Sequence, residues 1–202
     1  MPDATGSASA EVGGGTVGDF QVQLAAAASD RAATWEAVAD VLAVPDAGRT
    51  ERLRAGAHPA AWLRHCRWLG ADSDILAGPA TSLEAYARAS RRRDAGDDLA
   101  ALTADHTALV GPAGPSLAVS ALAVADLCRA EAAAWSAGDM AGGKAARVDQ
   151  RQIIDAEIVP ALVPIAGRLA TEAAAHVWRS LGRALLAVLS VETGTDHTDL
   201  SR

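Results

Sequence analysis

Histidine and cysteine are the side chains of this sequence best suited to chemistry, but their spacing forms no recognisable set. His58, His65 and Cys66 could be metal ligands, yet the proline after His58 puts it at a helix start and no acidic third ligand stands at helical spacing. Asp105 and His106 could be an orienter and a general base. Neighbouring helical residues point about 100° apart, however, and no nucleophile is evident.

Enzymes with common cofactors or nucleophiles carry short motifs, and none of these occurs here. The sequence has no Walker loop, GxGxxG, GxSxG or HExxH pattern. It also lacks a converging set of titratable groups. We therefore predict that the protein is not an enzyme and uses no metal and no cofactor. An enzyme that relies on a histidine or a thiol is the weakest of three hypotheses.

The charge balance argues against nucleic acid as a partner. The net charge is −7, and phosphates are repelled by an acidic protein unless a local basic patch dominates. The best basic patch is the arginine cluster of residues 88–93. Because Asp94, Asp97 and Asp98 follow at once, this segment is better interpreted as a solvated, mixed-charge helix end.

Local composition predicts the cellular compartment of the protein and the nature of its N-terminal segment. Cys66 and Cys128 have no CxxC partners, which favours buried free thiols in a reducing cytoplasm. Residues 1–19 lack the basic and apolar regions of a secretion signal and are expected to be a disordered tail. No stretch reaches the roughly 18 uncharged apolar residues of a membrane span. A soluble, cytoplasmic protein without membrane insertion is expected.

Alanine and leucine at helical spacing predict an all-α fold, a single-domain bundle of roughly eight to ten helices. This domain should span residues 20–192, followed by a flexible tail at 193–202. The expected helices lie at about 20–43, 49–55, 58–70, 81–93, 97–110, 116–137 and 171–191, with another after Gly138-Asp139 that carries Val148 and Ile154 to Leu169. Pro160 and Pro164 should cause a break or restart of that helix near Val159. Trp35 and Trp178 are expected in the core.

The stretch HTALVGPAGPS interrupts this pattern at residues 106–116. Leu109 and Val110 come directly before Gly111-Pro112, which should end one helix. Ser116 can then cap the next helix.

Four segments in the same order resemble the TorD/DmsD/NarJ family of redox-enzyme chaperones. WEAVADVLAVP resembles the family's opening helix, and LAALTADHTALVGPAGP resembles its helix that ends in a Gly-Pro turn. The stretch from Ala130 to Ala170 is similar to the late helix pair, and VWRSLGRALLAVLSVE to the closing helix. The resemblance covers about residues 28–192. It departs where the family has Asp-His, because Pro115-Ser116 stands there.

The resemblance implies a dedicated chaperone for the apo catalytic subunit of a molybdopterin oxidoreductase, often bound at its twin-arginine signal peptide. The branch that serves type II enzymes of the dimethyl sulfoxide reductase family is favoured. An acidic protein with an apolar groove between helices would complement such a peptide. The candidate client-binding residues are Asp97, Asp98, Asp105, His106, Leu109, Val110, Gly111, Pro112 and Glu157.

Each of these residues also has a structural interpretation. The acidic residues could be ordinary surface or helix-end charges, and Leu109 and Val110 could simply be core. A helical adaptor that binds an amphipathic helix of another partner is the second hypothesis. The sequence leaves open whether the protein is a monomer or a dimer.

Overall fold

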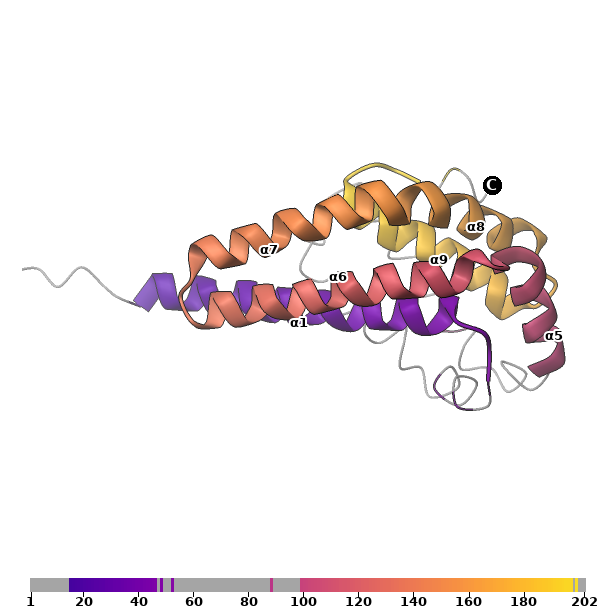
Figure 1. Ribbon diagram of the computed structural model, residues 1–202, viewed down its shortest axis with the longest axis horizontal. Coiled ribbons are helices and arrows are strands. Elements are labelled where there is room, and N and C mark those ends of the chain that lie inside the picture. The colour runs from indigo at the N-terminus through magenta and orange to yellow at the C-terminus, as the bar shows by residue number, and fades with distance from the viewer. Residues whose placement is uncertain are drawn as a thin grey trace, which may run out of the picture.

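The computed structural model describes residues 15–46, 48, 52, 88, 99–197 and 199. All regular elements in these residues are helical, which confirms the all-α class (Figure 1). They are α1 (Gly15–Leu42), α5 (Leu99–Asp105), η1 (His106–Val110), α6 (Ala113–Ser136), α7 (Met140–Ile153), η2 (Ile154–Ile158), α8 (Val159–Glu172) and α9 (His176–Thr193). The predicted number of eight to ten helices is not confirmed within these residues. The predicted helices at 49–55, 58–70 and 81–93 lie outside them.

Helices α1 and α6 form the longest packed pair of the bundle, running in opposite directions (Figure 1). The start of α6 lies against Leu42 at the end of α1. The predicted turn at Gly138-Asp139 is confirmed: Gly138 has a φ of 76°, and the Asp139 side chain accepts a 2.9 Å hydrogen bond from the Gly142 amide. This turn sends α7 back along α6.

Proline explains the junction between α7 and α8. The described part of the chain contains two π-helical turns, η1 and η2, and η2 leads directly into α8 at Val159. Pro160 stands in the first turn of α8, where a missing backbone donor is tolerated, while Pro164 lies inside the helix. A restart at Val159 was predicted, and α8 does begin there, but the backbone stays helical through the junction and Pro164 does not break α8.

Several predicted boundaries and side-chain orientations differ from the structure. α1 begins at Gly15, inside the predicted tail. α6 begins at Ala113 with Pro112 at its N-cap position, so Ser116 lies within the helix and does not cap it. α8 continues through Thr171 to Glu172, and the last helix starts only at His176. Val148 is 57% exposed, because its face of α7 points away from the bundle.

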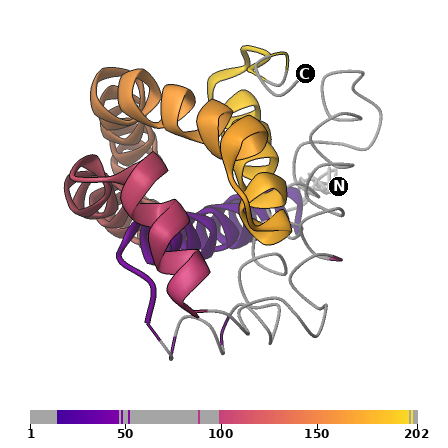
Figure 2. The same cartoon turned by 90° about the vertical axis from the view of Figure 1, so that its right-hand side faces the viewer.

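The core is continuous from α1 through α9. Trp35 and Trp178 both belong to it, as predicted. Seen along the long axis, α5 lies across one end of the bundle, in front of α1 (Figure 2). The segment Leu102–Val110 meets α6 at a bend of 85°. None of the described helices is alone long and apolar enough to cross a membrane; this bent pair reaches that length and composition only when both halves are joined.

Candidate functional site

The HTALVGPAGPS stretch forms a tightly anchored corner between α5 and α6. His106 is 2% exposed, and its Nε2 lies 2.9 Å from the Leu42 carbonyl oxygen at the end of α1. Its ring centroid is 6.3 Å from that of Trp178 in α9. The Trp178 indole in turn donates a 3.1 Å hydrogen bond to the Leu102 carbonyl. His106 thus packs against α1 and α9 and is too buried to contact a partner.

The Asp105 side chain caps the start of α9. Its Oδ1 accepts a 3.2 Å hydrogen bond from the Ala174 amide, and its Oδ2 a 2.8 Å bond from the Ala175 amide. Backbone amides at the start of a helix have no partner within it, and they favour a negative charge nearby. The carboxylate therefore stabilises the entry into α9 from a position far away in the sequence.

Leu109 and Val110 are 8% and 3% exposed and belong to the core. Both side chains therefore pack in the core, which was the structural interpretation of these residues, and neither lines an open groove. The Leu109 carbonyl accepts a 2.7 Å hydrogen bond from Arg168 of α8. This bond ties the π-turn to the neighbouring helix.

Glycine is required at two points of the corner. Gly111 has a φ of 60° and donates its amide to the His106 carbonyl at 2.9 Å, while Pro112 is exposed. Gly114 is buried, and a Cβ there would lie 2.5 Å from the Leu42 carbonyl oxygen. The glycine therefore permits the close approach of α6 to the end of α1.

The remaining acidic candidates are spread over the molecule. Glu157 is exposed on η2 and accepts a 2.7 Å hydrogen bond from the Ser120 hydroxyl of α6. Asp97 and Asp98 lie outside the described residues. The structure thus brings Asp105, His106 and Gly111 into one corner, with Glu157 on another element.

An open hollow of about 830 Å³ lies on the outer side of the same corner. It is lined almost entirely by small apolar surface from α5 and η1: Ala100, Thr103, Ala104, Thr107 and Ala108. Thr107 and Ala108 are exposed, whereas Leu109 and Val110 beside them turn inward. We call this depression the α5–η1 hollow. Thr107 and Ala108 are the part of the HTALVGPAGPS stretch that lines it.

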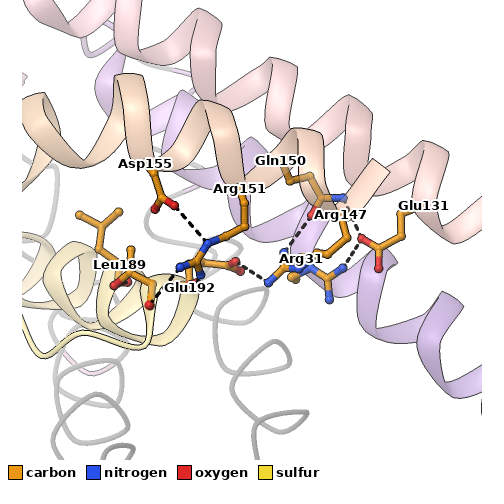
Figure 3. A network of polar contacts seen from close by, with 9 residues as sticks. Arg31, Glu131, Arg147, Gln150, Arg151, Asp155, Leu189 and Glu192 are labelled. Carbon is orange, nitrogen blue, oxygen red and sulfur yellow. Dashed lines mark hydrogen bonds and ion pairs between the residues drawn. The ribbon is translucent and has the colours of Figure 1, made fainter. Parts of the chain in front are cut away.

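A buried polar network joins α1, α6 and α7, and the motifs did not point to it. Arg31 and Glu131 form an ion pair in which both side chains are largely buried (Figure 3). Glu131 also accepts hydrogen bonds of 2.7 Å from Gln150 and 3.2 Å from the Trp135 indole. Burial acts to lower the pKa of Arg31, but the hydrogen bond and charge of Glu131 outweigh it, and the pKa is raised.

The network continues to the end of α9. Arg147 donates to Gln150 at 2.9 Å and to the buried carboxylate of Glu192 at 3.1 Å (Figure 3). Arg151 donates to the Glu192 and Thr193 carbonyls. A cation at the carboxyl end of a helix complements its dipole. The two ends of α9 are thus held by opposite charges, Asp105 at the start and Arg151 at the end.

Cys128 lies inside the same region of the bundle and is fully buried. Burial, aided by the nearby carboxylates of Glu192 and Glu131, raises the pKa of its thiol to about 12 against the opposing charge of Arg31. A thiol of this kind is protonated and unreactive at neutral pH. This agrees with its interpretation as a buried free cysteine.

Compared with models of protein families, with curated proteins and with solved structures, the chain gives no match. Within the described residues, no three histidine, cysteine or acidic side chains come close enough together to hold a metal ion.

Proposed function

We propose that this protein is a cytoplasmic, system-specific chaperone and not an enzyme. Its client would be the apo catalytic subunit of a molybdopterin oxidoreductase, bound often through its twin-arginine signal peptide until the cofactor is inserted and export begins. The resemblance of four segments to the TorD/DmsD/NarJ family supports this proposal. The branch that serves type II enzymes of the dimethyl sulfoxide reductase family is again favoured.

The observation that carries the proposal is the position of the α5–η1 hollow. It lies on the outer face of the segment that resembles the family's Gly-Pro turn, and its lining is almost wholly apolar. Small side chains such as Ala104 and Ala108 would let the backbone of a bound segment approach closely, while its apolar side chains leave water. In this proposal the client contacts Thr107 and Ala108, which directly precede the buried Leu109.

The corner behind the hollow is suited to a binding role because it is preorganised. His106 is bonded to Leu42, Leu109 to Arg168, and Asp105 to the start of α9. A surface that is already rigid loses less conformational freedom on binding. The same geometry would also serve a helical adaptor for another amphipathic partner, which remains the second candidate.

Co-expression with the molybdoenzyme catalytic subunit of the same genome tests the proposal. The tagged wild-type chain should capture the apo subunit, and the double variant Ala104→Arg/Ala108→Arg should capture about tenfold less, since both residues are exposed in the hollow. Ala145→Arg, at an exposed site on α7, is the matched control and should capture normally. Failure of the wild type to bind the subunit would overturn the chaperone proposal. Full capture by the double variant would show that the α5–η1 hollow is not the client-binding surface.

A further inference from the structure

The first half of α6 presents an apolar stripe to solvent. Val119 is 67% exposed and Leu122 47% exposed, and Pro115 one turn earlier is also exposed. Residues spaced i, i+4 and i+7 lie on one side of a helix. Single exposed aliphatic residues are ordinary, but three in register form a continuous strip.

Carboxylates border this strip on two sides. Asp126 follows Leu122 by one turn, and its side chain is 74% exposed although it also pairs with Arg129. Glu157 reaches the strip from η2, because its carboxylate accepts the 2.7 Å hydrogen bond from Ser120, the neighbour of Val119. We call Pro115, Val119, Leu122, Asp126 and Glu157 together the acidic α6 face.

Among the described residues, Arg129 stands directly after the first half of α6 and forms ion pairs with Asp126 and with Glu36 of α1. Segments 113–128 and 152–167, which form the first part of α6 and the η2–α8 junction beside it, carry Asp126, Asp155 and Glu157 but no lysine or arginine. Asp155 pairs with Arg151, which comes just before the second segment. The carboxylates of Glu36, Asp126, Asp155 and Glu157 thus outnumber the guanidinium groups of Arg129 and Arg151 that pair with them, in a protein whose net charge is −7. This excess favours a cationic partner.

We propose that the acidic α6 face binds a cationic amphipathic segment of a partner protein. The apolar side of that segment would cover Pro115, Val119 and Leu122, and its arginines or lysines would reach Asp126 and Glu157. Burial of the apolar strip would supply affinity, while the charges would set orientation and association rate. This inference rests on the proposed function only because it takes a protein segment as the ligand. The acidic α6 face is a surface separate from the α5–η1 hollow.

A synthetic peptide tests the inference without any client. The probe is a fluorescein-labelled helix of about 20 residues with leucine on one face and flanking arginines, read by fluorescence anisotropy. Asp126→Asn/Glu157→Gln should weaken binding about tenfold at low salt and by less at 0.5 M salt, because screening already removes most of that attraction. Val119→Ser/Leu122→Ser should weaken binding by a similar factor at both salt concentrations.

The matched control is Val148→Ser/Asp149→Asn, which removes one exposed aliphatic residue and one exposed carboxylate from α7. It should bind the peptide as the wild type does. An equal loss in this control would overturn the inference, since net charge alone would then explain binding. Equal affinity for a peptide with glutamine in place of arginine, or for a single-stranded oligonucleotide, would overturn it as well. Because no client takes part, these outcomes are independent of the capture experiment.

Discussion

His106 and Leu42 are joined by a hydrogen bond between the imidazole Nε2 and the backbone carbonyl oxygen, 2.9 Å apart. The bond links the π-turn after α5 to the last turn of α1, 64 residues earlier in the chain. A carbonyl at the end of a helix has no partner within the helix and is costly to bury unpaired. His106 is therefore a structural residue of the corner.

Replacing His106 tests this role. His106→Leu keeps most of the volume but removes the donor, so the free energy of unfolding should fall by about 1–3 kcal/mol. Urea denaturation followed by circular dichroism measures it. His176→Leu, which changes an exposed histidine at the start of α9, should stay within about 0.5 kcal/mol of the wild type. Equal stabilities of the two variants would contradict the role of the bond.

The glycine at the start of α6 gives a second prediction. A Cβ on Gly114 would lie 2.5 Å from the Leu42 oxygen and 2.8 Å from Val110 Cγ1, so Gly114→Ala should destabilise the protein by about 1–3 kcal/mol. A Cβ on Gly18 would meet nothing within 4 Å. Gly18→Ala in α1 should therefore stabilise by up to about 1 kcal/mol, because alanine is the better helix former. Thermal unfolding of both variants gives the signs, and a stabilising Gly114→Ala would refute the close approach.

Local features of the fold could be predicted from the sequence because their causes are local. Pro160 removes a backbone donor wherever it stands, so a restart of the helix near Val159 could be predicted from the sequence. Gly138-Asp139 supplies both a left-handed residue and a capping carboxylate, which fixed the turn before α7. The core position of Trp35 followed from helical spacing alone. The prediction that Ser116 caps this helix was wrong, because Pro112 can also precede a helix start and α6 begins at Ala113.

The site was harder to predict because its contacts join distant parts of the chain. Nothing near Asp105 indicates that it caps a helix that starts after residue 175. Leu109 and Val110 are apolar, and that is equally compatible with a groove or a core. Glu131 did leave a signal: it lies on the buried face of α6, at helical spacing from Val124 and Cys128. A carboxylate in that register requires a buried partner, but only the fold shows that the partners are Arg31 and Gln150.

The buried ion pair of Arg31 and Glu131 leads to a third prediction. Glu131→Ala leaves the Arg31 guanidinium buried without its carboxylate and should lower the free energy of unfolding by about 3–5 kcal/mol. Asp126→Asn, on the exposed side of the same helix, should cost about 1 kcal/mol or less. Chemical denaturation of the two variants measures the difference. A loss below about 1 kcal/mol in Glu131→Ala would show that the network contributes little.

The Cys128 thiol gives the last prediction, on alkaline stability. Its folded pKa of about 12 lies above the ordinary value of 9.0, so between these values the unfolded chain releases a proton that the folded chain retains. Unfolding is therefore favoured as pH rises through this range, by up to about 1.4 kcal/mol per pH unit from this group. Below pH 9 the contribution is fully present and does not vary with pH.

Cys128→Ala should remove this dependence, so that the difference in unfolding free energy between wild type and variant changes from pH 8.5 to pH 11. Urea titrations at each pH measure it, in a Cys66→Ser background that leaves one thiol. In the same background, Cys128 should resist iodoacetamide at pH 8 in the folded protein and react promptly in 8 M urea, because burial keeps the thiol protonated and inaccessible. Rapid labelling of the folded chain, or a difference that does not vary with pH, would mean that the thiol is open to solvent.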